Sequence, residues 1–330
     1  MYSQKTGSSK ITINANSEYE GGRYIMKSLI IYFSQTGNTR SMAKCIHDGI
    51  MKVTSQCDIK ALNEVDIRNL SDYDLVGIGS PVFYLKEPFN VRDFIESLPE
   101  LNGQHWFIFC THGNIVGNFF PLTAERLKKK GGIVIGFHHT YANITVPFYP
   151  RPSYTSGHPD SHDLEQAKQF GREIAERSVA IKNQNSIPVT PPYPVSSEEW
   201  VKESNIFTEE LLKQRLPKLS INIDTCIQCH ECEENCPVQG IDVQDNPPRI
   251  QKPCIFCWRC VTICPTLSIG ANWEPLVRMA PANYARYKKE LDKAAARGEF
   301  RWLVKPESII LDDPLYKKRE REVSTKSRDE

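Results

Sequence analysis

Two runs of cysteine are the residues best suited to chemistry in this chain. Eight of the eleven cysteines fall into two copies of the pattern C-x2-C-x2-C-x3-C-P. Those eight are Cys226, Cys229, Cys232 and Cys236, then Cys254, Cys257, Cys260 and Cys264. Thiolates bind zinc as well as iron–sulfur clusters, and C-x2-C pairs occur in both kinds of site. Zinc has no use for a third cysteine at this spacing or for the proline that follows.

The doubled run resembles the signature of bacterial two-cluster ferredoxins. The resemblance implies that each [4Fe-4S] cluster is bound by three thiolates of one run and the fourth thiolate of the other. It assigns Cys226, Cys229, Cys232 and Cys264 to cluster 1, and Cys254, Cys257, Cys260 and Cys236 to cluster 2. We expect a small α+β bicluster ferredoxin domain over residues 221–271. Because so small a domain has little apolar core, the clusters should contribute much of its folding energy.

Length, charge and the other cysteines limit the classes of function. A chain of 330 residues suggests two or three domains, and a net charge of +1 gives no field that favours nucleic acid. No apolar run approaches the roughly 20 residues that span a bilayer, so we expect no transmembrane segment. Cysteine-rich chains without an export signal point to a reducing, cytoplasmic location. We expect Cys45, Cys57 and Cys110 to be buried structural thiols.

A second candidate site is the loop that follows the apolar run at residues 27–33. Its residues are Ser34, Gln35, Thr36, Gly37, Asn38 and Thr39. Backbone N–H groups at the start of the next helix, together with the hydroxyl groups, could bind a phosphate. The loop has neither the Lys of a Walker A motif nor a GxGxxG pattern, so a nucleoside triphosphate or a dinucleotide fits it poorly. An ordinary turn in which Ser and Thr cap the helix is the alternative.

The elements around this loop alternate between strand and helix. The predicted strands cover residues 27–33, 57–62, 73–79, 105–110 and 132–137. The predicted helices cover residues 39–51, 90–97, 119–129 and 161–182. Parallel strands need helical crossovers, so this alternation predicts an α/β domain with a doubly wound parallel five-stranded sheet over residues 26–184.

Two further loops leave the same edge of the predicted sheet, where ligands of such folds bind. One contains Ser80, Pro81, Val82, Phe83, Tyr84 and Leu85, and the other contains Thr111, His112, Gly113 and Asn114. The first could place an aromatic side chain beside a flat ring, and the second could supply donors to the edge of that ring. Alternatively, Phe83 or Tyr84 covers the sheet edge, and His112 is a loop residue without a task.

These three loops resemble those of the flavodoxin family, which holds flavin mononucleotide (FMN) there. The resemblance implies that residues 34–39 bind the phosphate, that Pro81 to Tyr84 flank the isoalloxazine, with Ser80 also at the flavin site, and that residues 111–114 contact its polar edge. The whole arrangement over residues 26–271 is similar to a family of fused flavodoxin and bicluster ferredoxin proteins. That family implies electron transfer, since clusters pass single electrons and a flavin accepts one or two.

The remaining segments are expected to connect or extend the two domains. We expect residues 1–25 to form a disordered extension and residues 185–220 a proline-containing linker with short helices near 197–202 and 208–215. Residues 272–330 should hold a helix from Pro281 to Arg297 and then a charged, mostly disordered tail.

Three functions remain open at this point. The first is an electron carrier, or an electron-delivering subunit, that serves a redox partner protein in anaerobic-type metabolism. The second is a flavin-dependent reductase that acts on a small acceptor such as a quinone, with Tyr84, His112 and His138 or His139 as proton donors. The third is a scaffold that has lost its flavin and only binds partners.

Overall fold

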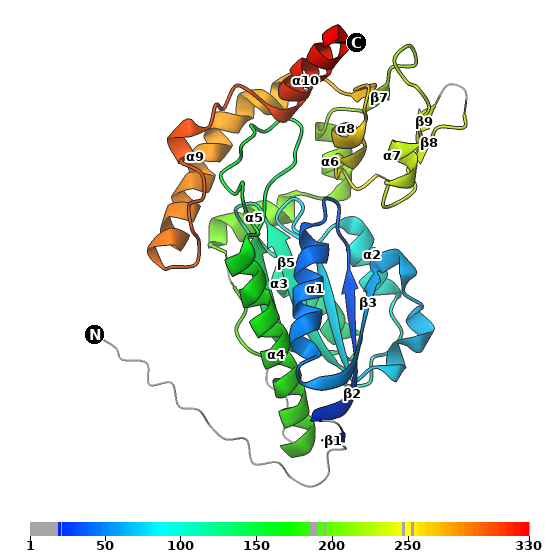
Figure 1. Cartoon of the computed structure of the whole chain (residues 1–330), viewed down its shortest axis with the longest axis vertical. Coiled ribbons are helices and arrows are strands. Elements are labelled where there is room, and N and C mark those ends of the chain that lie inside the picture. The colour runs from blue at the N-terminus through cyan, green and yellow to red at the C-terminus, as the bar shows by residue number, and fades with distance from the viewer. Residues whose placement is uncertain are drawn as a thin grey trace.

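The structure, a computed structural model, describes residues 19–20, 22–184, 190–194, 196–245, 248–251 and 254–329. An N-terminal domain and a smaller C-terminal domain lie one above the other, with the last helices beside the second (Figure 1). Residues 1–18, most of the predicted N-terminal extension, lie outside the described part. So do residues 185–189, which belong to the proline-containing linker.

A parallel sheet forms the centre of the N-terminal domain. Its strands are β2 (Arg23–Tyr32), β3 (Thr54–Ala61), β4 (Leu75–Pro81), β5 (His105–His112) and β6 (Ile133–Tyr141). They pair in parallel in the order β3-β2-β4-β5-β6, and β1 (Tyr19–Glu20) adds an antiparallel pair to β2. Strand β3 lies on one side of β2 and β4 on the other, so the strand order reverses between β2 and β4. Ligands bind at such a reversal point in folds of this kind. The predicted flavodoxin-like fold is confirmed.

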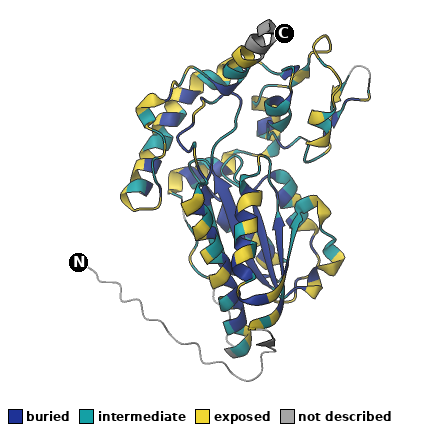
Figure 2. Ribbon diagram, in the orientation of Figure 1, coloured by how far each residue is buried: buried dark blue, intermediate teal, exposed yellow. Residues whose placement is uncertain are grey.

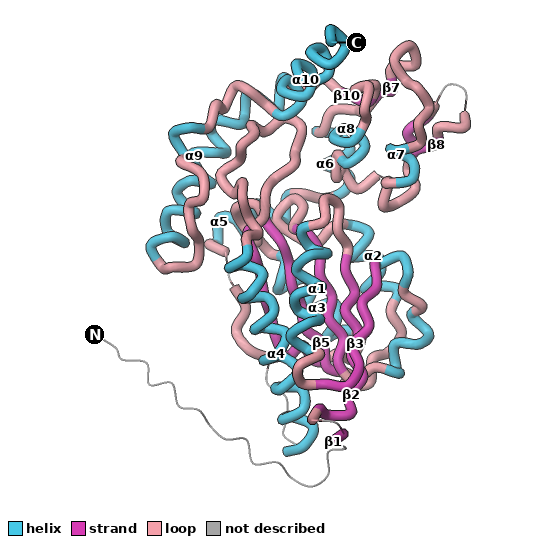
Figure 3. The backbone as a smooth tube through the Cα atoms, viewed as in Figure 1, coloured by secondary structure: helices cyan, strands magenta, loops and turns pink. Residues whose placement is uncertain are grey.

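Helices cover both faces of this sheet (Figure 3). Helix α1 (Asn38–Ile50) and helix α4 (Ser161–Gln184) bury apolar side chains against one face, including Ile46 and Ile174. Helix α2 (Phe89–Ser97) and helix α3 (Phe119–Lys129) cover the other, with Ile95 and Phe120 in its core. Two short 3-10 helices, Leu62–Glu64 and Ile67–Asp72, connect β3 to β4. The inner strands β4 and β5 are almost entirely buried, whereas β3 at the edge of the sheet keeps exposed residues (Figure 2).

The C-terminal domain is built from very short elements. Strand β7 (Ser220–Ile221) pairs with β10 (Ile269–Gly270), and β8 (Ile241–Asp242) pairs with β9 (Arg249–Ile250), both antiparallel. Helix α7 (Glu231–Glu234) lies inside the first cysteine run, and α8 (Arg259–Ile263) inside the second. Helix α5 (Glu198–Ile206) and helix α6 (Glu209–Arg215) precede the domain, near the two short helices expected there.

The ends of the chain are more ordered than the sequence predicts. Strands β1 and β2 already occupy residues 19–20 and 23–25, which we expected to be disordered. Helix α9 (Glu274–Ala296) starts well before Pro281 and runs through it, so the predicted start is wrong. A 3-10 helix (Pro306–Ser308) follows. The predicted disordered tail is also wrong, because α10 (Leu315–Asp329) is a helix.

Helix α10 is held in place by residues far away in the sequence. Its Leu315 N–H donates to the carbonyl of Tyr149 at 2.8 Å, and its Tyr316 N–H donates to the carbonyl of Pro147 at 3.0 Å. The buried Leu315 side chain adds an apolar anchor. Composition alone predicts disorder for this charged segment. The prediction fails because the apolar anchors of the segment lie at one end, and the residues that they contact lie in a distant loop.

That distant loop, residues 142–160 between β6 and α4, joins the two domains. It rises from the sheet toward the C-terminal elements (Figure 1). Phe148 packs on Trp258 and Trp273 of the C-terminal domain, with ring centroids 6.0 and 5.8 Å apart. Tyr149 packs on Tyr284 of α9 at 5.4 Å. The loop therefore shares one apolar core with the cysteine-containing domain and fixes it above the sheet.

Two glycines allow α1 and α4 to approach closely. A Cβ atom at Gly171 would lie 2.1 Å from the Ile46 carbonyl oxygen, and one at Gly49 would lie 2.0 Å from that of Lys168. Real side chains do not tolerate such distances, so both positions need glycine for contact between the helix backbones.

We therefore expect Gly171→Ala to lower the free energy of unfolding of the N-terminal domain by about 1–3 kcal/mol, the usual cost of overpacking. Urea denaturation followed by circular dichroism measures this. Gly270→Ala is the matched control, because a Cβ there meets nothing within 4 Å. An unchanged urea midpoint for Gly171→Ala would contradict the close helix contact.

Candidate redox sites

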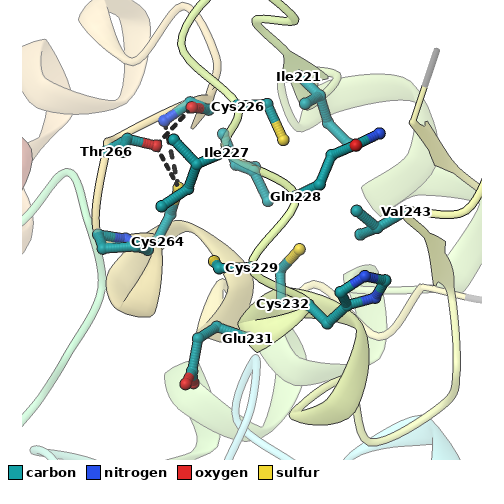
Figure 4. A pocket seen from close by; sticks show the side chains of 14 residues that line it. Ile221, Cys226, Ile227, Gln228, Cys229, Glu231, Cys232, Val243, Cys264 and Thr266 are labelled. Atoms are coloured by element: carbon teal, nitrogen blue, oxygen red, sulfur yellow. Dashed lines mark hydrogen bonds between the residues drawn. The ribbon is translucent and has the colours of Figure 1, made fainter. Parts of the chain in front are cut away.

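Four cysteines surround one cavity in the outer part of the C-terminal domain. They are Cys226, Cys229, Cys232 and Cys264, which we call set 1. The thiol groups point into the space between them from different sides (Figure 4). The first three come from the loop and helix of the first run, and Cys264 comes from the end of α8.

The other four cysteines surround a second cavity. They are Cys236, Cys254, Cys257 and Cys260, which we call set 2. Sets 1 and 2 are the same two groups of four that the ferredoxin resemblance assigns to clusters 1 and 2. Within the described residues, no three His, Cys, Asp or Glu side chains are arranged to hold a single metal ion.

The backbone of the two runs repeats the same unusual conformation. Left-handed φ angles occur at Gln228 (51°), His230 (61°) and Gln239 (53°), and at the matching positions of the second run, Phe256 (54°), Trp258 (60°) and Leu267 (56°). Such angles cost of order 1 kcal/mol each and persist only where the surroundings require them. The turns direct backbone N–H groups at sulfur: Gly240 donates to Cys236 at 3.1 Å and Ser268 to Cys264 at 3.2 Å.

Burial makes several of these thiols hard to ionise without a metal. It raises the pKa of Cys232 to about 11 and that of Cys257 to about 12. A bound metal ion displaces the thiol proton, so these cysteines ionise to thiolates when metal binds. At Cys264, burial acts in the same direction, but hydrogen bonds from Thr266 and from backbone N–H groups outweigh it and lower the pKa.

The two sets differ in what surrounds them. Set 1 faces solvent: Cys229 is exposed, and Ile223 and Ile227 keep 58% and 63% of their surface exposed. Set 2 faces the N-terminal domain, where the buried Ile255 and the half-buried Cys257 join the core on the α2 and α3 side of the sheet. Set 1 therefore lies beside exposed residues, and set 2 lies at the domain junction.

The predicted phosphate loop follows β2 at the reversal point of the sheet. Gly37 has a left-handed φ of 95°, and its N–H donates to Ser34 Oγ at 3.1 Å. Gly37 is also the N-cap residue of α1, and within the described residues no side chain caps the N-terminal end of this helix. The buried Thr39 Oγ1 lies 2.8 Å from Thr111 Oγ1 and so ties this loop to the third one. The exposed Thr36 leaves its hydroxyl available to a ligand.

The second loop makes a tight turn with two different aromatic residues. Phe83 and Lys86 exchange backbone hydrogen bonds of 2.9 and 3.0 Å, and the residues between them, Tyr84 and Leu85, have positive φ angles. The Phe83 ring packs edge-on against Phe33 at 6.2 Å, which is the sheet-covering alternative. Tyr84 instead points to the C-terminal domain, where its hydroxyl donates to the carbonyl of Phe256 at 3.0 Å.

The third loop contains buried polar atoms that have no hydrogen-bond partner among the described residues. They are Nδ1 of His112, a residue only 4% exposed, and Oδ1 of Asn114. Buried polar atoms are normally paired, so these two fit a ligand with a polar edge, as the isoalloxazine of FMN has. Burial, followed by the neighbouring His139, holds the pKa of His112 well below its usual range, so this imidazole is neutral.

The three candidate proton donors on β5 and β6 are divided between the two faces of the sheet. His112 Nε2 lies 2.9 Å from His139 Nδ1, so these two form a hydrogen-bonded pair. His138 packs on Phe170 of α4 with ring centroids 5.0 Å apart, on the other face. The structure brings His112 and His139 together and leaves His138 out.

The contact that sequence reasoning missed lies between the loops predicted to hold the flavin and the second cysteine run. The Gln35 amide donates to the carbonyl of Cys257, and the Tyr84 hydroxyl donates to the adjacent carbonyl of Phe256. No spacing in the sequence signals these pairs, because each joins residues more than 170 positions apart. Loops expected to hold the flavin thus also hold the loop of set 2.

The three cysteines outside the runs lie in the N-terminal domain. Cys57 and Cys110 are buried and Cys45 is half-buried. Burial raises the pKa of Cys57 to about 12, which leaves it an unreactive thiol.

Within the described residues, no helix combines the length and the apolar character needed to cross a membrane.

Known proteins match the two halves of the chain separately. Residues 29–127 match a family model described as a flavodoxin domain, and residues 218–265 match one described as a 4Fe-4S dicluster domain. A flavodoxin of Clostridium saccharobutylicum is 30% identical over 165 residues, which cover 46% of this chain and 97% of that protein. An NAD(P)H dehydrogenase (quinone) of Archaeoglobus fulgidus is 24% identical over 185 residues, 45% of this chain and 95% of that protein. A solved flavodoxin from the domain Archaea is 24% identical with a TM-score of 0.37, and the match covers 47% of this chain and 99% of that one.

These matches establish the cofactor classes. A flavodoxin domain indicates a flavin, FMN, and a dicluster domain indicates [4Fe-4S] chemistry, so the two together support a role in electron transfer. The chain belongs to the flavodoxin family, as a protein in which a flavodoxin domain is fused to a 4Fe-4S dicluster domain.

Proposed function

We propose that the chain carries electrons along a fixed line of three centres. Cluster 1, bound by set 1, is the exposed end; cluster 2, bound by set 2, lies at the domain junction; FMN occupies the three loops at the edge of the sheet. The observation that carries this proposal is the pair of hydrogen bonds from Gln35 and Tyr84 to the set 2 loop. Clusters supply one-electron steps and the flavin one- or two-electron steps, so such a line joins donors and acceptors of both kinds.

The residues of the chain hold each centre in a different way. The cysteine thiolates bind iron, and N–H groups such as those of Gly240 and Ser268 stabilise their negative charge. The N-terminal end of α1, with the Ser34 and Thr36 hydroxyls, binds the FMN phosphate. His112 and Asn114 offer polar atoms to the ring edge.

The exposed end has the charge that a redox partner would recognise. Residues 219–248 contain six carboxylates and no Lys or Arg. The carboxylates are Asp224, Glu231, Glu233, Glu234, Asp242 and Asp245. A partner with a basic surface around its own redox centre would be steered to cluster 1 by this field. The function is thus completed by a larger redox enzyme, and the chain delivers electrons to it or takes them from it.

A flavin-dependent reductase is the second candidate. It is favoured by the hydrogen-bonded pair of His112 and His139 near the flavin loops, and by the similarity to the quinone dehydrogenase of Archaeoglobus fulgidus. We expect the reconstituted chain with a reductant and a quinone, but no partner protein, to show no sustained turnover. Steady turnover in this assay would favour the reductase over the carrier.

Thr36→Ala tests the phosphate loop. We expect it to weaken FMN binding about tenfold, because a hydrogen bond to a charged group contributes roughly 1.5 kcal/mol or more. Flavin fluorescence titration of the apoprotein measures the affinity, and the iron content should stay at the wild-type value. Ser55→Ala, at an exposed position on β3, is the control. Wild-type affinity in Thr36→Ala would show that this hydroxyl does not contact the phosphate.

The double variant Gln35→Ala, Tyr84→Phe tests the line of centres. We expect reduction of the flavin by the clusters to slow about three- to tenfold, because each lost hydrogen bond costs the junction about 1 kcal/mol. Stopped-flow absorbance after rapid anaerobic reduction of the clusters measures the rate.

Tyr193→Phe, on a ring that packs against Phe137 instead of a cysteine loop, is the matched control. Iron and FMN contents must equal those of the wild type for the comparison to count. An unchanged rate in the double variant with full cofactors would refute the proposed route through the junction.

A further inference from the structure

A guanidinium group from the C-terminal helix contacts the backbone of set 1. Arg319 of α10 donates from Nη1 to the carbonyl of Val261 and from Nη2 to the carbonyl of Cys264, each at 2.7 Å. Both carbonyls belong to the last turn of α8 and its end, where the helix dipole is negative. Arg319 is half-buried, so solvent and salt screen its charge less than that of an exposed residue.

The position of this charge matters because Cys264 belongs to set 1. Its sulfur already accepts a hydrogen bond from the Ser268 N–H at 3.2 Å and lies 3.8 Å from the Thr266 hydroxyl (Figure 4). Arg319 adds a full positive charge one peptide group away from that sulfur. Arginine keeps its charge at every relevant pH, so this is a permanent field.

The matching place in the first run has the opposite charge pattern. The carbonyls of Cys236 and of its counterpart Cys264 each accept a backbone hydrogen bond, from Gln239 at 3.2 Å and from Leu267 at 3.4 Å, so the difference lies in the added guanidinium at Cys264. The counterpart of Val261 is Glu233, whose carboxylate bonds to His230 at 2.7 Å. The two runs share a repeated backbone conformation. Within the described residues, a guanidinium binds these carbonyls at the end of α8 but not at the matching place in the first run.

We propose that Arg319 raises the reduction potential of cluster 1. This inference rests on the proposed function, because it requires a cluster bound by set 1. Adding an electron makes a cluster more negative, so a fixed nearby cation stabilises the reduced form more than the oxidised form. The C-terminal helix therefore makes the exposed cluster a better electron acceptor than its thiolates and acidic surroundings alone would allow.

A purely structural role is the competing explanation. Arg319 could serve only to attach α10, as the buried Leu315 and the backbone bonds to residues 147 and 149 already do. Charge and attachment can be separated, because Gln keeps donor groups without the charge and Lys keeps the charge with a different shape.

The test is an anaerobic redox titration of the reconstituted full chain, followed by electron paramagnetic resonance. Cys229→Ser identifies the signal of cluster 1. We expect Arg319→Gln to lower the ratio of reduced to oxidised cluster 1 about tenfold at a fixed ambient potential, a shift of about 59 mV for one electron. Cluster 2 and FMN should titrate as in the wild type, and Arg319→Lys should restore most of the shift.

Arg321→Gln is the matched control, since it removes one positive charge from the same helix at a residue paired with Asp313. The inference fails if Arg319→Gln leaves the potential of cluster 1 unchanged at full iron content. It also fails if Arg319→Lys shifts the potential as far as Arg319→Gln, because the effect would then be structural. Iron for a single cluster in the wild type would instead refute the proposed function, and the inference with it.

Discussion

The arrangement of the redox sites depends on two hydrogen bonds that cross the domain junction. The Gln35 amide and the Tyr84 hydroxyl bind the consecutive carbonyls of Cys257 and Phe256. A carbonyl removed from water needs a partner, and these two find theirs in loops of the other domain. Both loops leave the sheet at its reversal point. The same constraint therefore positions the cysteine loop and the predicted flavin site together.

This junction is supported by chain segments that neither domain needs by itself. The loop at residues 142–160 leaves the sheet, packs Phe148 against Trp258 and Trp273, and accepts backbone hydrogen bonds from α10. A cysteine-containing domain with strands of two residues each has little core of its own. Packing its tryptophans on this loop supplies apolar contact that such a small domain lacks, and it limits rotation of one domain against the other.

The two cysteine sets combine a repeated backbone with different surroundings. Matching left-handed residues at Gln228 and Phe256, or at His230 and Trp258, give both loops the same shape. The side chains at those positions differ: polar near the exposed set 1, aromatic near set 2. Reduction potentials depend on charge, hydrogen bonds to sulfur and exposure, so one backbone can hold two centres with different properties. Acidic surface, Arg319 and the domain junction each act on one set more than on the other.

The sequence by itself determined the features that depend on neighbouring residues. Five strands, the four helices that cover the sheet and two cysteine runs follow from short-range periodicity and spacing, because hydrogen bonding within elements and tight turns is local. The sequence did not predict three features: the helical tail, the passage of α9 through Pro281 and the hydrogen bond of Tyr84 at the junction. Each depends on contacts between residues more than a hundred positions apart, such as Tyr84 with Phe256 or Leu315 with Tyr149. Only the tertiary structure decides which distant carbonyl a side chain binds. Those hydrogen bonds determine which cysteine set faces the predicted flavin loops and which faces solvent.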